Sequence, residues 1–200
     1  MPKHREQRKN RHTKSIKEMV YILVEGRRGN KSEKTYFNIL NRIQKDKVLK
    51  TETKKTAISN DIDGTEHSNF KKVAVCDTDI NETHTLETFI TELQSYVKSG
   101  YTVYISNESW ETWIKYHFED ASELDGYDKK EKWYLEHQAI FSDTDIISRA
   151  IRNSIQVCDS LSLPHGIAKS EDIQTFIREY KYCSNQPFTM VGFLLQSLIE

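Results

Sequence analysis

Two short apolar segments, each ending abruptly on carboxylates, do most to constrain the fold of this chain. Residues 19–24 lead directly into Glu25, and residues 73–76 lead into Asp77 and Asp79. Runs this apolar are typical of strands that are buried on both faces of a parallel sheet. The carboxyl ends of such strands lie at one edge of the sheet, where α/β proteins bind their ligands. We therefore expect the three acids to lie close together.

Three carboxylates at one edge repel each other unless a cation lies among them. In an extended segment Asp77 and Asp79 point the same way, and Glu25 would join them from the neighbouring strand. Hard oxygen ligands favour Mg²⁺ or Mn²⁺, so we predict that these three residues are metal ligands. The alternative is that they are turn residues which follow a strand and bind their own backbone.

Strands that alternate with helices predict an α/β fold with a mostly parallel sheet flanked by helices. We expect strands over 19–25, 72–76 and 101–106, with a weak candidate at 55–59 in a polar, irregular stretch from 46 to 70. Expected helices begin at Ser32 and then span 83–99, 110–118, 128–140, 143–159, 170–180 and 188–199. The predicted units are a basic flexible arm over 1–17, an α/β core over 18–120 and a helical C-terminal region over 121–200 that packs on the core.

The arm carries seven basic residues between positions 3 and 17 against one glutamate, although the whole chain has a formal net charge of −1. Such an arm binds phosphate backbones without reading sequence, or it serves as a solubilising tail. The three cysteines are widely spaced, which fits reduced thiols in the cytoplasm. No apolar segment suggests a signal peptide or a membrane span, so we expect a cytoplasmic protein without a membrane partner.

Further polar residues follow the predicted strands. Glu111 either supports the metal site or is a buried acid that pairs with Lys115. His117 either acts directly in catalysis or is a hydrogen-bonded structural histidine. Glu82 is a candidate for holding a metal-bound water. Residues 26–32 lie where a phosphate-binding P-loop would lie, but their glycines do not fit that pattern.

Four segments resemble the RloB-like family of Toprim-related proteins, which occur in bacterial abortive-infection and anti-phage loci. Residues 24–26 (VEG) and 32–37 (SEKTYF) resemble the family pattern E-G-x-x-T-E-x-x-Y-F, with a longer spacer and with serine in place of threonine. Residues 75–79 (VCDTD) resemble its D-x-D after a strand. Residues 106–118 (SNESWETWIKYHF) resemble S-N-x-x-F-E-x-W-x-x-x-H-F. The ending at 185–189 (NQPFT), otherwise a cap and hinge for the last helix, also fits.

The resemblance implies a Toprim-like fold and a metal-dependent nuclease. Glu25 would be the general acid/base and Asp77 and Asp79 the ligands of Mg²⁺, with Glu111 and His117 as further catalytic candidates. The basic residues near the site would hold the nucleic-acid backbone. These are Arg27, Arg28 and Lys31.

The resemblance also implies a biological setting. The protein would be an effector of an anti-phage system, favoured as an endoribonuclease that cleaves tRNA or other RNA. It would be encoded beside a partner ATPase of the ABC or OLD-like type. Two alternatives stay open: a Mg²⁺-dependent DNA nuclease with the same acids, and a non-catalytic regulatory subunit of the ATPase complex. The sequence does not predict self-association either way.

Overall fold

The computed structural model describes residues 17–25, 32–43, 46–54, 70–107, 109–118 and 134–199. Within these ranges a single sheet has the strand order β2-β1-β3-β4-β5. The strands are β1 (Glu18–Val24), β2 (Lys47–Thr53), β3 (Lys71–Asp77), β4 (Thr102–Asn107) and β5 (Phe188–Thr189). The first four are parallel to their neighbours, and β5 is antiparallel to β4. The predicted α/β class with a mostly parallel sheet is confirmed.

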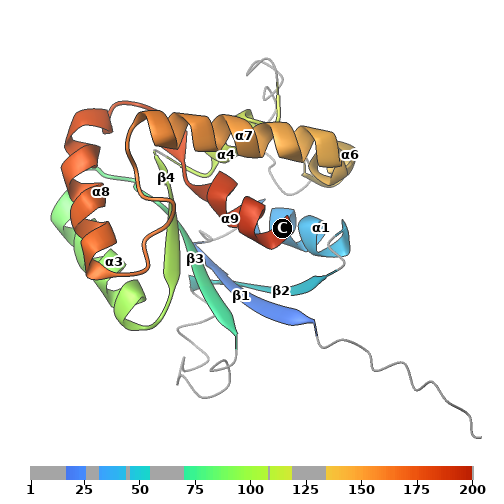
Figure 1. Cartoon of the computed structure of the whole chain (residues 1–200), viewed down its shortest axis with the longest axis horizontal. Helices are drawn as coiled ribbons and strands as arrows, with labels where there is room; N and C mark the ends of the chain where they lie inside the picture. The colour runs from blue at the N-terminus through green and yellow to red at the C-terminus, as the bar shows by residue number, and fades with distance from the viewer. Residues whose placement is uncertain are drawn as a thin grey trace, which may run out of the picture.

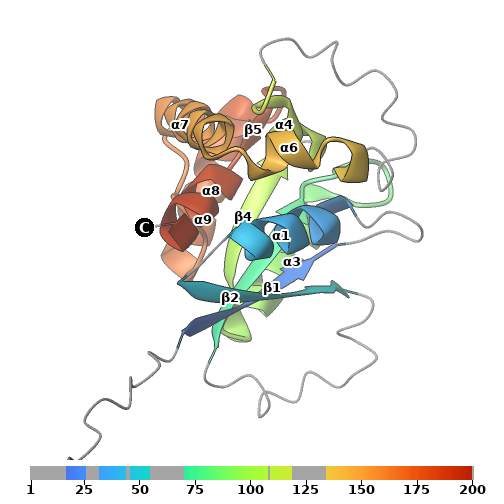
Figure 2. The same ribbon diagram turned by 90° about the vertical axis from the view of Figure 1, so that its right-hand side faces the viewer.

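Helices cover both faces of this sheet. They are α1 (Ser32–Ile43), α3 (Leu86–Lys98), α4 (Glu111–Lys115), α6 (Gln138–Ser142), α7 (Thr144–Ser160), α8 (Ser170–Cys183) and α9 (Val191–Ile199). Figure 1 shows α3 and α8 on one side of the sheet and α1 and α9 on the other, with α7 running across one end. Figure 2 shows the same layers from the side, with α1 in front of the strands and α3 behind them. A sheet covered on both faces requires apolar residues on both faces of its central strands.

The sheet order places the ends of β1 and β3 side by side. Ile22 pairs with Val73 and Val24 with Val75, so the two apolar segments recognised in the sequence are neighbours. From β1 the chain passes through α1 to β2 on one side, and from β3 it passes through α3 to β4 on the other. The direction of winding therefore reverses between β1 and β3, which is where open α/β sheets form their ligand sites.

Strand β2 was not predicted, because residues 46–70 were expected to be irregular. Only Leu49 and Thr51 of β2 are buried; Lys50, on the other face, is exposed, and the remaining residues of the strand are half-buried. Lys50 and Glu52 form an ion pair at 3.3 Å on this other face. An edge strand buries one face only, so it lacks the continuous apolar run that identified β1 and β3. The weak strand candidate at 55–59 lies outside the described residues.

The last expected helix was wrong at its start. Phe188 and Thr189 form strand β5 opposite Asn107 and Ser106, and the helix begins at Val191. The hydroxyl groups of Ser106 and Thr189 are hydrogen-bonded at 2.8 Å. Thr189 is β-branched, which favours extended backbone, and a two-residue strand is too short to show a period in sequence. Through β5 the C-terminal region adds a strand to the sheet.

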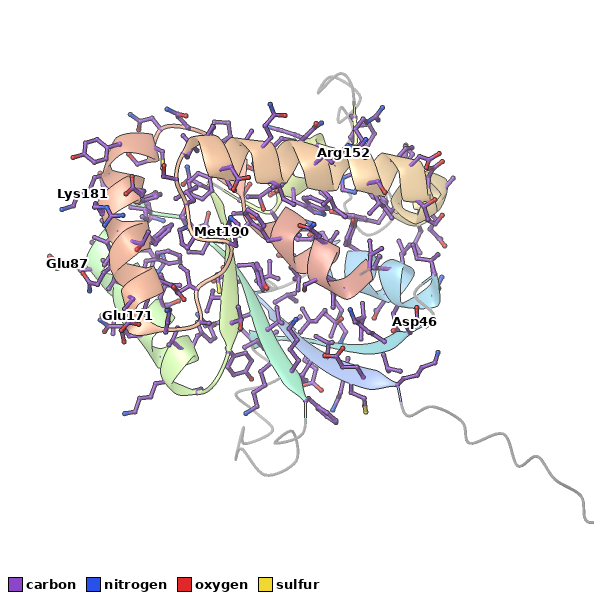
Figure 3. All side chains as sticks on the ribbon, viewed as in Figure 1. Asp46, Glu87, Arg152, Glu171, Lys181 and Met190 are labelled. Atoms are coloured by element: carbon purple, nitrogen blue, oxygen red, sulfur yellow. The ribbon has the colours of Figure 1, made fainter. Side chains whose placement is uncertain are left out.

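Helices α7 and α9 approach closely where β5 turns into α9. The Gly192 amide donates to Ser154 Oγ at 3.3 Å, and a Cβ at Gly192 would lie 2.7 Å from Ser154 Cβ. Met190, labelled in Figure 3, directly precedes α9 and is fully buried. The helices expected over 83–99, 143–159 and 170–180 are confirmed as α3, α7 and α8. The helix expected over 110–118 is the shorter α4, and the one expected over 128–140 begins in residues that are not described, with α6 at its end. No helix in the described ranges has the length and apolar character needed to cross a membrane.

Candidate metal centre

The three predicted acids meet at the carboxyl ends of β1 and β3. Glu25 directly follows β1, Asp77 is the last residue of β3, and Asp79 lies in the turn that comes next. One carboxylate oxygen from each lies within 4.8 Å of the other two, and all three side chains are half-buried. Oxygen ligands of one Mg²⁺ at about 2.1 Å lie roughly 3 to 4 Å apart, so modest side-chain movement would suit the ion. Among the described residues this group consists of three carboxylates without a thiol or an imidazole, which matches a hard divalent cation.

The turn after β3 brings Asp79 back towards Asp77. Asp79 has a φ of 39°, in the left-handed region that aspartate tolerates better than most residues. The Asn81 side chain donates to the Asp79 carbonyl at 2.8 Å, and the Thr78 amide donates to the carbonyl of Ser106 at 3.0 Å. The sequence pattern predicts an extended Asp-x-Asp segment. The structure instead joins the two carboxylates through this fixed turn.

The surroundings of Glu25 raise its pKa. Burial is the largest cause, Lys54 opposes it, and the nearby carboxylates of Glu92 and Glu33 add to it. Lys54 Nζ donates to Glu92 Oε2 at 2.9 Å, while His84 Nε2 lies 3.7 Å from the other oxygen of Glu92. A carboxyl group whose pKa is raised by burial holds its proton more readily than an ordinary glutamate, as a general acid requires.

These neighbours of Glu25 were missed in the sequence. Lys54 follows β2, which was not recognised, and Glu92 is one of the two acids on α3. Glu33 is 6% exposed and accepts a hydrogen bond from Ser32 Oγ at 3.1 Å. A serine and a glutamate at the start of a helix usually cap it, so their positions do not indicate that Glu33 is buried near Glu25.

His117 lies inside an aromatic cluster. Its ring is 1% exposed and packs against Trp113, Tyr36 and Phe141 at centroid distances of 4.9, 5.6 and 5.3 Å. Nδ1 lies 3.2 Å from the Trp113 carbonyl, which only accepts, so Nε2 accepts from the Tyr36 hydroxyl at 3.0 Å. Burial lowers the pKa of His117 to about 4. This geometry favours the structural alternative for His117 over the catalytic one.

The remaining candidates are not part of the acid cluster. Glu111 is the half-buried first residue of α4, and Glu82 is exposed in the loop after Asp79. Lys115, the suggested partner of Glu111, is exposed. The predicted nucleic-acid contacts fall outside the described residues, as does the basic arm except its last residue. These contacts are Arg27, Arg28 and Lys31.

The fold and the acid cluster define an α/β protein with a candidate divalent-metal site at the switch point of its sheet. A family model described as RloB-like protein matches residues 20–198, which extend from β1 to α9. The chain therefore belongs to the RloB-like family. No curated protein and no solved structure matches it.

Proposed function

We propose that this protein is a metal-dependent endonuclease and the effector of an anti-phage, abortive-infection system. The observation that carries the proposal is the meeting of Glu25, Asp77 and Asp79 at the switch point of the sheet. Such a cluster is costly without a cation, and phosphodiester cleavage is a reaction that a bound divalent cation assists. The family resemblance supplies the biological setting.

In the proposed mechanism Asp77 and Asp79 would hold a divalent cation, which would supply stabilisation of negative charge on the phosphodiester oxygens. Glu25 lies within reach of both aspartates and acts as general acid/base at the attacking or the leaving oxygen. Lys54 and Glu92 surround Glu25 with fixed charges that influence its proton affinity.

RNA, and tRNA in particular, is the proposed substrate. This preference rests on the resemblance to Toprim effectors and on the basic arm, whose charge suits a phosphate backbone. The proposed partner is an ATPase of the ABC or OLD-like type that restrains or triggers the nuclease.

The test is a cleavage assay with the full chain, Mg²⁺ or Mn²⁺, total tRNA and a supercoiled plasmid. We expect discrete RNA fragments that disappear in Glu25→Gln and Asp77→Asn. Glu87→Gln is the matched control, because Glu87 is an exposed acid on α3 outside the cluster (Figure 3). Nicked plasmid with intact tRNA would favour the DNA nuclease instead. Absence of cleavage with and without the ATPase would contradict the proposal and favour a regulatory subunit.

A further inference from the structure

A pocket of about 590 Å³ adjoins the acid cluster, and Asp79 belongs to both. Its walls come from residues 78–81 in the turn after β3, from Leu86 on α3, from Asn107 at the end of β4, and from the end of α8 with the turn that follows. A volume of this order is typical of sites for small organic ligands. The pocket therefore opens beside the place where the scissile phosphate would bind.

One buried amide joins three of these walls. Asn107 Oδ1 accepts hydrogen bonds from Thr78 Oγ1 at 2.8 Å and from Tyr180 Oη at 3.1 Å. Its Nδ2 donates to the carbonyls of Ser184 and Gln186 at 3.0 and 2.8 Å. All four hydrogen-bonding positions of the amide are thus used within the protein. The pocket is preformed, because the β3 turn and the end of α8 are held to β4 through this side chain.

Other groups in the pocket remain available for a ligand. In the described part of the chain, the side chains of Lys181, Ser184 and Asn185 form no hydrogen bond or ion pair. Ile80 and Leu86 add apolar surface, and Ile80 is 38% exposed. Lys181 lies on α8 at the outer edge of the molecule in Figure 3.

This mixture of groups suits a nucleoside. Aliphatic side chains contact the flat face of a base, and an amide and a hydroxyl hydrogen-bond to its edge. A lysine at the rim offers a positive charge to a flanking phosphate. Because Asp79 contributes to both sites, a ligand with its phosphate at the acid cluster would place its own base in the pocket.

We propose that this pocket binds one nucleoside of the polynucleotide, next to the phosphate held at the acid cluster. The inference rests on the proposed function and adds where the substrate base is recognised. It also gives a role to the 185–189 segment, whose sequence alone indicates only a cap and hinge for the last helix. Asn185 lines the pocket, while Thr189 fixes the segment to β4 through Ser106.

The test compares two ligands by calorimetry, with Ca²⁺ in place of Mg²⁺ to suppress cleavage. Adenosine 3′,5′-bisphosphate carries two phosphates and a base, whereas ribose 3,5-bisphosphate carries the same two phosphates and no base. We expect the full chain to bind the adenosine bisphosphate about tenfold more tightly. Asn185→Trp, which fills the pocket, should abolish this preference. The matched control is Gln186→Trp, since Gln186 is the exposed next residue and does not line the pocket; it should keep the preference.

Asn185→Leu, a smaller change, should weaken the preference by removing the amide without filling the pocket. Circular dichroism and Mn²⁺ binding by each variant show that the fold and the acid cluster are intact. A wild-type protein with equal affinity for both ligands, or an unchanged preference in Asn185→Trp, would overturn the inference.

A second arm uses a short single-stranded RNA. If Asn185→Trp loses affinity for the RNA, the natural ligand of the pocket is part of a polynucleotide. If it loses affinity for adenosine 3′,5′-bisphosphate but not for the RNA, the pocket binds a free nucleotide and the inference is overturned. Failure of the proposed function is seen separately, as absence of Mn²⁺ binding or of RNA cleavage by the wild type.

Discussion

Protonation of His117 is expected to destabilise the folded protein in mildly acidic solution. The ring has almost no contact with solvent, and both of its nitrogens are hydrogen-bonded in the neutral form. The Arg149 guanidinium donates to the His117 carbonyl at 3.1 Å and adds positive charge nearby. A second proton on the ring would therefore bury a positive charge, and it would turn Nε2 into a donor, so that the Tyr36 hydroxyl loses the acceptor for its own proton.

The two pKa values set the size of this effect. The pKa of His117 falls from 6.5 to about 4 on folding, so the unfolded chain binds more protons between these values. The free energy of unfolding then decreases as the pH falls through this window and is unaffected by His117 above it. Between about pH 7.5 and pH 5 the expected loss is roughly 2 kcal/mol.

Urea unfolding of the wild type and of His117→Gln measures this effect. Fluorescence of the buried Trp110 and Trp113 reports the transition. The wild type should be the more stable at about pH 7.5, and the difference should shrink by roughly 2 kcal/mol at pH 5, because glutamine does not titrate. Carboxylates that titrate in this range affect both proteins and cancel in the difference. A difference that stays constant with pH would refute the buried, neutral state of His117.

Three further predictions concern packing and charge. Gly192→Ala should lower the free energy of unfolding in urea by about 1 to 3 kcal/mol, because the new methyl group would lie 2.6 Å from Ser154 Oγ. Adding Ser154→Gly to this variant should recover part of the lost stability. Thr51→Val should be neutral or stabilising by up to about 1 kcal/mol, since the buried hydroxyl has no hydrogen-bond partner among the residues that the structure describes; a clear loss in urea unfolding would contradict this. In metal-free buffer Asp77→Asn should raise the melting temperature by relieving repulsion at the acid cluster. Mn²⁺ should raise the melting temperature of the wild type but not that of the variant. A metal-free variant that melts below the metal-free wild type in calorimetry would contradict the repulsion.

The parts of the fold that were predicted are those whose burial is visible in one stretch of sequence. Strands β1 and β3 are apolar on both faces, so each is visible in the sequence as an uninterrupted apolar run that ends at an acidic residue. Strand β2 buries one face at the edge of the sheet, and β5 has two residues that pair only because the chain returns to β4. Neither strand carries a local signal strong enough to separate it from loop.

The same distinction holds for the candidate site. Glu25, Asp77 and Asp79 were predicted to meet because the ends of parallel strands share an edge, and the structure brings them together. Lys54 and Glu92 reach Glu25 from a strand end and a helix face that only the three-dimensional packing joins. Asn107 similarly gains its role from two segments distant in sequence.

Titration with Mn²⁺, followed by calorimetry and by electron paramagnetic resonance, tests the central claim most directly. The wild type should bind one Mn²⁺ per chain at the acid cluster. Glu25→Gln, Asp77→Asn and Asp79→Asn should each weaken binding by about tenfold or more, and Glu87→Gln should bind as the wild type does. Absence of Mn²⁺ binding by the wild type, or affinity unchanged in all three acid variants, would contradict a metal centre formed by these residues.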